Sequence, residues 1–293
     1  VESTLISHGL PYPQNLEVAR ASEAAVREPG AIPATVAIHD GAILVGLDDT
    51  DLEALATAPD GSVLKAARPS LAAALAGRGW AATTVSATMM AADTAGIRVF
   101  ATGGIGGVHR TAFGGPGVGG QPLRPSLDVS SDLEELARTP VAVVCAGPKA
   151  ILDVPLTLEI LETRGVPVIA IGQDDVPGFY AVHSGVPAPG VARDVDAAAD
   201  LVRTHLGLGL GSGVLVCTPV PADVALGSDV VADVVERAIG EAETGLVRGP
   251  ALTPWLLARI AVLTDGASVR ANTALIVNDA RVAGRMAVAL RAG

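Results

Sequence analysis

The chain has 293 residues, of which 49% are hydrophobic and 17% charged, and its net charge is −11. Such acidity argues against a nucleic-acid binder, which needs a basic surface, although a local group of cations can still receive a phosphorylated metabolite. No apolar run of about 18 residues escapes polar interruption, which argues against a membrane span, and no signal peptide is visible. With 34 glycines and 2% aromatic residues, the composition fits a compact α/β enzyme better than a disordered or fibrous chain.

Short apolar runs alternate with amphipathic stretches along the whole chain. The predicted strands are, in chain order, residues 1–6, 34–38, 42–45, 98–102, 141–145, 166–170, 180–183 and 213–217. The predicted helices are residues 14–27, 69–76, 84–95, 131–138, 148–164, 194–204, 229–244, 254–264 and 274–292. Strands that alternate with helices are typical of βαβ units. We therefore predict a single α/β domain over residues 1–293, with a mostly parallel central sheet flanked by helices (α/β/α) and a helix-rich C-terminal part.

Two local features complete this outline. Residues 112–125, AFGGPGVGGQPLRP, are crowded with glycine and proline, which predicts a mobile surface loop and no regular element. Cys145 and Cys217 each lie in an apolar run, so we expect buried free thiols in core strands. Free thiols indicate a reducing cytoplasm.

The most informative count concerns the basic residues. The chain has 18 arginines and only two lysines, Lys65 and Lys149. A guanidinium cannot lose its proton and attack a carbonyl, whereas an amine can. The two lysines are therefore candidates for chemistry, and the alternative is that they remain by chance.

Lys149 follows the predicted strand 141–145 after the short turn Ala146-Gly147-Pro148. Proline favours the first position of a helix, so we expect Lys149 in the first helical turn, where the helix dipole disfavours its charged form. The carboxyl ends of parallel strands border the ligand crevice of such sheets. An amine there suits Schiff-base chemistry, and an ion pair with Asp153 is the structural alternative.

A glycine-rich segment follows the predicted strand 98–102 and reads TGGIGGVH, ending at His109. It matches a dinucleotide-binding fingerprint only superficially, because His109 stands where the third glycine is required. A backbone-amide nest for a phosphate, with His109 as an added donor, is one interpretation. A tight turn without a ligand is the other.

Two carboxylates lie in the segment LDVSSDLEEL. Asp132, with Ser131, has the character of a helix-start residue. Asp128 precedes them and is a candidate ligand for a hard cation. One carboxylate with waters suits Mg²⁺ or Mn²⁺, and the sequence has no Cys/His cluster of the kind that zinc needs.

Separate segments of the chain resemble pseudouridine-5′-phosphate glycosidases, and the similarity covers nearly the whole length in order. These segments are VESTLISHG (1–9), PATVAI (33–38), ATTVSAT (82–88), FATGGIGGVHR (100–110), DVSSD (128–132), VCAGPK (144–149) and NTALIVN (272–278). The resemblance implies an α/β/α fold, a homotrimer, and a manganese-dependent enzyme. The implied reaction is the reversible cleavage of pseudouridine 5′-phosphate into uracil and ribose 5-phosphate.

The resemblance also implies roles for individual residues. Lys149 matches the Schiff-base nucleophile, Glu2 the proton donor, and Asp128 the aspartate that anchors Mn²⁺. The positions implied to bind substrate are Lys65, Val85, Ser130 and Asp132, with His109 and Asn272 matching contacts to the phosphate and the base. Both lysines of the chain thus fall on site positions of the family.

This chemistry has a physical reason. A C–C glycosidic bond offers no leaving heteroatom to protonate, so two carboxylates alone cannot cleave it. An iminium at C1 of the sugar supplies an electron sink, and Lys65 nearby would lower the pKa of the nucleophile by like-charge repulsion. A related C-ribosyl synthase, which joins ribose 5-phosphate to an aromatic acceptor, is the alternative; a non-catalytic sugar-phosphate sensor and a Schiff-base aldolase are less favoured.

Overall fold

The computed structural model describes residues 1–116, 122–123, 125–247 and 249–291. Its central sheet has five parallel strands in the order β12-β11-β13-β9-β5. They are β5 (Val99–Ala101), β9 (Ala142–Cys145), β11 (Val168–Ile171), β12 (Gly190–Ala192) and β13 (Val214–Cys217). Every residue of β9 and β13 is buried, as expected for strands that are covered on both faces. The predicted parallel central sheet is confirmed.

Helices cover both faces of this sheet. One face packs against α5 (Val85–Thr94), α6 (Ser131–Leu136) and α7 (Val154–Thr163). The opposite face packs against α8 (Val195–Gly207) and α11 (Ala267–Arg291). Alternate side chains of β9 and β13 enter these two separate cores, which is the side-chain period of a strand. The α/β/α arrangement predicted from the alternation of strands and helices is confirmed.

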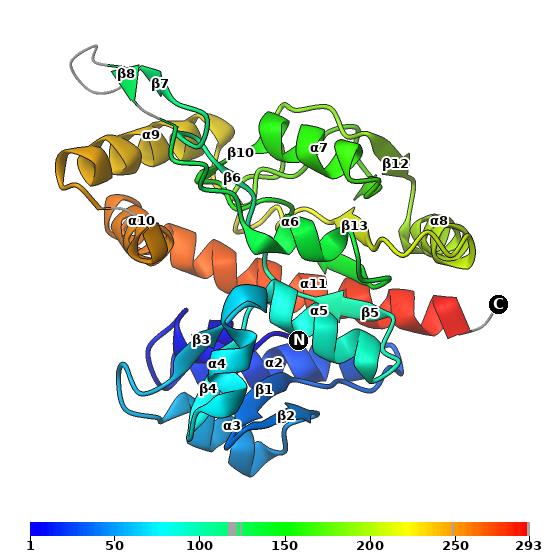
Figure 1. Cartoon of the computed structure of the whole chain (residues 1–293). Coiled ribbons are helices and arrows are strands. Elements are labelled where there is room, and N and C mark those ends of the chain that lie inside the picture. Colours follow the sequence, from blue (N-terminus) through cyan, green and yellow to red (C-terminus); the bar gives the residue numbers. More distant parts are fainter. Residues whose placement is uncertain (117–121, 124, 248, 292–293) are drawn as a thin grey trace.

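A second, four-stranded sheet has the order β2-β1-β4-β3. Its strands are β1 (Val36–His39), β2 (Ala42–Val45), β3 (Leu64–Ala66) and β4 (Trp80–Thr83). β1 pairs antiparallel with β2 and β4, whereas β3 and β4 are parallel. The helices of this part of the chain are α2 (Gln14–Arg27), α3 (Asp49–Ala56) and α4 (Leu71–Ala76). Figure 1 shows α11 crossing the molecule between this part and the central sheet, and α11 packs on both α2 and β5.

The C-terminal part is helical, as predicted. The long α11 follows α9 (Ser228–Thr244) and α10 (Leu252–Leu263). A short 3-10 turn, η3 (Gly249–Ala251), connects α9 to α10. Among the described residues, no single helix has the length and apolarity to cross a membrane; α10 and α11 meet those criteria only as a pair bent by 118°. The smaller elements are α1 (Thr4–Ser7), η1 (Arg68–Ser70), β6 (Val108–His109), β7 (Gly115–Pro116), β8 (Pro122–Leu123) and β10 (Leu152–Asp153).

Three local predictions are wrong. Residues 1–6 form no strand, because Thr4–Ser7 turn into α1. Val1 alone makes strand-like bonds: its N donates to Ala34 O (3.0 Å) and its O accepts from Val36 N (3.1 Å). Residues 180–183 form no strand: residues 180–182 are bends, Tyr180 and Ala181 pack into the core, and His183 is exposed. The loop 112–125 contains the short antiparallel pair β7–β8, and its residues 117–121 and 124 lie outside the described part of the chain.

Candidate active site

Lys149 lies in the connection between β9 and β10, where the chain is bonded to the glycine-rich turn after β5. Lys149 N donates to Ile105 O (3.2 Å), and Ile105 N donates to Gly147 O (3.1 Å). Gly147 has a φ of +84°, a conformation that glycine adopts without strain. The two turns therefore hold each other at the carboxyl ends of neighbouring parallel strands, which is where ligands bind in such sheets.

The expected helical position of Lys149 is wrong. The helix α7 begins only at Val154, because Asp153 is its N-cap and accepts from Leu156 N (3.0 Å). The residues before it pair β10 with β6 instead. The alternative ion pair also does not form: across the described chain, no carboxylate lies within salt-bridge distance of Lys149 or Lys65. Asp153 caps a helix instead, and the Lys149 amine forms no salt bridge with a described residue.

The glycines of the turn 103–107 are required by close packing. A Cβ on Gly104 would lie 2.5 Å from Cε2 of Phe179, and a Cβ on Gly106 would lie 2.3 Å from Oγ of Ser130. Gly106 N donates to Asp132 Oδ2 (2.9 Å). This packing explains the glycines without a ligand, so the phosphate nest stays a prediction.

Asp132 is buried and its carboxylate accepts from two backbone amides. Ser86 N, in the first turn of α5, donates to Oδ1 (3.1 Å), and Gly106 N donates to Oδ2. Ser130 is the N-cap of α6, and its Oγ accepts from Asp132 N (3.2 Å). The carboxylate therefore joins two helix N-termini and the glycine turn, in a position where a negative charge is favoured.

Glu2 is also buried, at 8% exposure. The hydroxyl of Thr102, which directly follows β5, donates to Glu2 Oε1, and the hydroxyl of Thr4 donates to Oε2 (2.5 Å). These threonines were not singled out from the sequence, although Thr102 stands at the start of the glycine-rich segment. They fix the orientation of a carboxyl group at the strand ends.

Lys65 connects these groups electrostatically. It lies on β3, which sequence analysis missed, beside Ala82 of β4. The residue has solvent access, yet desolvation by the surrounding protein lowers the pKa of its amine. The like charge of Lys149 lowers this pKa further, whereas Glu2 and Asp132 raise it. The two lysines and two carboxylates that the sequence selected thus lie in one cluster.

His109 lies near both Asp128 and Lys149. His109 N donates to Asp128 O (3.1 Å). Desolvation lowers the pKa of the His109 imidazole and the Lys149 charge acts in the same direction, against the opposing effect of Asp128. Both residues line a cavity of about 100 Å³ whose floor includes Ile239 and Leu256.

The surroundings of Asp128 are compatible with one carboxylate ligand to a metal ion. No hydrogen bond or salt bridge to another described residue engages its carboxylate. No group of three or more His, Cys, Asp or Glu side chains in the described residues is placed to hold a metal. One free carboxylate fits an ion that keeps most of its waters, as Mg²⁺ and Mn²⁺ do, and does not fit zinc.

Val85 and Asn272, the remaining predicted site residues, differ in burial. Val85 is the first residue of α5. Its side chain is 1% exposed and packs in the core between this helix and the central sheet, so only its backbone can contact a substrate. Asn272 lies half-buried in α11, near the residues Leu275 and Ile276 that pack against Gly103. Asn272 is placed close to the glycine turn by that packing.

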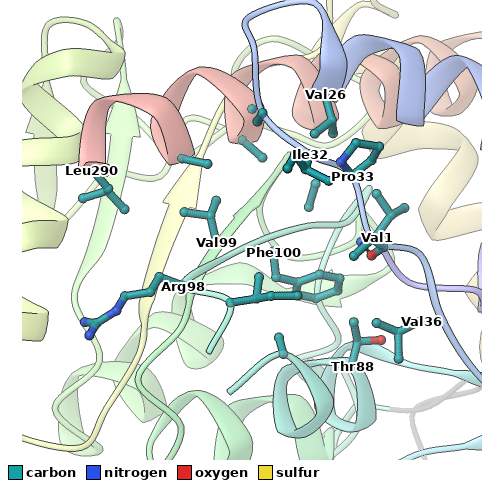
Figure 2. Close-up of a pocket in the computed structure, with 18 of the residues that line it drawn as sticks. Val1, Val26, Ile32, Pro33, Val36, Thr88, Arg98, Val99, Phe100 and Leu290 are labelled. Atoms are coloured by element: carbon teal, nitrogen blue, oxygen red, sulfur yellow. Dashed lines mark hydrogen bonds between the residues drawn. The ribbon is translucent and has the colours of Figure 1, made fainter. Parts of the chain in front are cut away.

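A larger cavity, of about 370 Å³, shares no lining residue with this cluster. Figure 2 shows it bordered by Ile32 and Pro33, by Phe100 of β5 and by Leu290 of α11. Its lining is mainly apolar and contains neither lysine. We place the candidate active site at the lysine cluster, because only there do an amine, buried carboxyl groups and strand ends meet.

Comparison with known proteins identifies the family of this chain. The family model of indigoidine synthase A like proteins matches residues 1–289. Pseudouridine-5′-phosphate glycosidase of Paracoccus denitrificans is 52% identical over 99% of this chain and 92% of its own length. The chain belongs to the family of indigoidine synthase A like proteins. The same enzyme name is carried by a protein of Caldanaerobacter subterraneus subsp. tengcongensis, 49% identical over 99% of this chain and 90% of its own length.

Solved structures of family members share the fold. The prealnumycin C-glycosynthase AlnA, in complex with ribulose 5-phosphate, has a TM-score of 0.87 and 35% identity, covering 99% of this chain and 90% of its own. An indigoidine synthase A-like protein of Thermotoga maritima has a TM-score of 0.86 and 31% identity, covering 99% and 91%. The family resemblance read from the motifs is confirmed.

Proposed function

We propose that the chain reversibly cleaves pseudouridine 5′-phosphate into uracil and ribose 5-phosphate through a Schiff base on Lys149. The observation that carries this proposal is the convergence of the chain's only two lysines with Glu2 and Asp132. Relatives at about half identity over nearly the whole chain bear the name of this activity. A cytoplasmic location fits this metabolic role and the two buried free cysteines.

In this mechanism, Lys149 Nζ forms a bond to C1′ as the C1′–O4′ bond of the ribose ring breaks, and the proton that the amine loses goes to O4′. Glu2 then delivers a proton to C5 of uracil, the electron pair of the C1′–C5 bond forms the new C5–H bond, and the nitrogen lone pair completes a C=N bond. Water adds to the resulting iminium, which releases ribose 5-phosphate as an aldehyde and restores the amine. Glu2 is suited to this step because two threonine hydroxyls fix its carboxyl group.

The charges near Lys149 suggest how the substrate lies. The charges of Lys149 and Glu2 act on Lys65. The charges of Lys149 and Asp128 act on His109. If Glu2 protonates the base, the base lies against Glu2, and the phosphate end of the open sugar would reach towards His109 and Asp128. A Mn²⁺ ion held by Asp128 would neutralise phosphate charge there.

Borohydride reduction in the presence of ribose 5-phosphate and Mn²⁺, followed by peptide mass mapping, tests the covalent step. The wild type should carry a pentose-phosphate adduct on the peptide that contains Lys149. Lys149→Arg should carry none, and Lys65→Arg, a matched control that leaves Lys149 as the remaining lysine, should still form it more slowly. An adduct on Lys65, or none on folded wild type, would overturn the proposal.

A C-ribosyl synthase is the second candidate, and one observation favours it: the structural similarity to a C-glycosynthase at 35% identity. Both activities share the lysine adduct, so the acceptor separates them. Release of uracil from pseudouridine 5′-phosphate, followed by its absorbance change, would support the glycosidase and exclude the synthase.

The homotrimer implied by the resemblance is also a proposal. Light scattering coupled to size-exclusion chromatography measures the particle mass directly against the 29.3 kDa chain. A mass of one or two chains would contradict it.

A further inference from the structure

The strand that carries Lys65 is weakly anchored by its own sheet. β3 is three residues long and lies at the end of the strand order β2-β1-β4-β3. Among the described residues it pairs only with β4, and Leu64 and Lys65 are exposed. Segments with few buried contacts open at a low free energy. The place of the Lys65 side chain therefore depends on what holds the residues that follow β3.

Arg68, in η1, binds these residues to the helix α6. Its Nε donates to Oε2 of Glu135, and its Nη2 donates to Oε1 (3.3 Å). The Glu135 side chain has no solvent exposure and also accepts from the hydroxyl of Thr139. A guanidinium that meets a carboxylate through two nitrogens fixes the direction of the pair as well as its distance. The pair therefore holds η1 against α6 in one orientation.

The backbone of Arg68 makes a second connection, to the helix α5. Arg68 N donates to Ser86 Oγ (3.1 Å), and Ser86 N donates to Oδ1 of Asp132 (3.1 Å). Asp132 and Glu135 are three residues apart in α6 and so lie on the same face of that helix. Asp132 also accepts from Gly106 N, so its own place does not depend on Arg68. The part of the site that Arg68 holds is the segment around β3.

A buried glutamate with the same two kinds of partner lies elsewhere in the chain. Glu23 accepts from Arg27 (2.8 Å) and from the hydroxyl of Thr35 (2.7 Å). Glu23 and Arg27 both lie in α2, four residues apart, so their ion pair lies within one helix. The Arg68–Glu135 pair instead joins the part of the chain with the second sheet to a helix that packs on the central sheet. The first pair is therefore a matched control for the second.

We propose that Arg68 is a positioning residue, which holds the strand that carries Lys65 against the helix that carries Asp132. Both are implied substrate-binding positions, so a displaced β3 should weaken the capture of ribose 5-phosphate. The proposal rests on the proposed function, because capture is measured from the adduct on Lys149. Asp132 keeps its two amide bonds when Arg68 is replaced, so the loss should depend on Lys65.

The test is borohydride-trapped adduct formation as a function of ribose 5-phosphate concentration. Arg68→Gln should raise the half-saturating concentration at least about 10-fold and change the maximal rate by less than about 3-fold, because a misplaced binding group weakens capture and leaves Lys149 in place. Arg27→Gln is the matched control, and it should saturate as wild type does. In a Lys65→Gln background, Arg68→Gln should have less than about a 2-fold further effect, because the group that it would displace is gone.

Arg68→Gln leaves the buried charge of Glu135 without its partner, which destabilises the fold. A second variant, Arg68→Met with Glu135→Leu, removes both charges together and should raise the half-saturating concentration as Arg68→Gln does. Wild-type saturation in this double variant would overturn the proposal. An effect of either variant that is equal with and without Lys65 would also overturn it, because a general loss of packing acts alike in both backgrounds.

The ¹³Cε signal of Lys65 gives a readout that needs no adduct. Desolvation lowers the pKa of this amine, and release of β3 should bring the pKa closer to its ordinary value of about 10.4. Arg68→Gln should therefore raise the pKa of Lys65, and Arg27→Gln should leave it unchanged. An unchanged pKa in Arg68→Gln refutes the positioning role. If the pKa rises as expected but wild type forms no adduct, the proposed function fails and the positioning of Lys65 stands.

Discussion

Replacing Asp132 with asparagine should lower the free energy of unfolding by about 3 kcal/mol. The carboxylate accepts from Ser86 N at 3.1 Å and from Gly106 N at 2.9 Å. Asparagine keeps one acceptor and turns an NH₂ group towards the other backbone donor. The variant loses one charge-assisted hydrogen bond, worth about 1.5–3 kcal/mol, and leaves a buried N–H unpaired, at about 1–3 kcal/mol. The lower burial cost of a neutral amide offsets part of this sum, which places the result near its lower end.

Urea unfolding at neutral pH measures this loss. The matched control is Asp128→Asn, because no described residue forms a hydrogen bond with that carboxylate, and it should stay within about 0.5 kcal/mol of wild type. Asp132→Asn should also lower the pKa of the Lys65 amine, since the charge of Asp132 raises it. An Asp132→Asn protein as stable as wild type would refute the assignment of the two amide bonds as supports of the site.

Three further predictions use single substitutions. The chain has only two lysines, so selective ¹³Cε labelling should give two lysine signals. Lys149→Gln should raise the pKa of Lys65 by removing a like charge. An unchanged titration of Lys65 would show that the two amines do not interact. Gly104→Ala should destabilise the fold by about 1–3 kcal/mol, because its methyl group would lie 2.5 Å from the buried ring of Phe179. The control is Gly240→Ala in α9, where an added Cβ would meet nothing within 4 Å. This variant should be neutral or stabilising in the same urea assay. Burial raises the pKa of the Asp279 carboxyl well above its usual value of about 3.9. The folded state therefore keeps a proton that the unfolded chain loses, and wild-type stability falls as pH rises above about 4. The stability of Asp279→Asn relative to wild type should grow over the same change, by up to about 1.4 kcal/mol per pH unit, and a pH-independent difference would contradict the raised pKa.

Local patterning was sufficient for much of the fold. The helix Gln14–Arg27 and the strand Ala42–Val45 have the predicted bounds, because an amphipathic period of 3.6 and an apolar run bounded by glycines are unambiguous over these lengths. β3 escaped notice because it is three residues long and two of its residues are exposed. A strand of that kind has no apolar period to detect, although it carries Lys65.

The start of α7 shows that one of the arguments that selected Lys149 from the sequence was wrong. Pro148 and Pro155 are both compatible with a helix start, and only Asp153, with its bond from Leu156 N, decides between them. Lys149 therefore loses the helix-dipole argument but keeps its position at the end of β9. The lysine count depends on chemistry rather than on helix bounds, so the choice of Lys149 as the candidate nucleophile does not change and stays a prediction. The distances among Glu2, Lys65 and Lys149 depend on long-range packing, which no local pattern in a single sequence measures.

The charges of the cluster constrain how a phosphorylated sugar can react there. The formal charges of the two lysines and of Glu2 and Asp132 cancel, and a bound phosphate adds about 1.5–2 negative charges. A negative charge close to an amine favours its ammonium form and so opposes imine formation. The opposition has to be relieved at the phosphate end, near Asp128, where we propose the divalent cation. Chelation of Mn²⁺ should therefore slow adduct formation with ribose 5-phosphate more than with ribose, which lacks the phosphate, as measured by borohydride trapping. Equal slowing with both sugars would show that neutralising the phosphate is not the role of the ion.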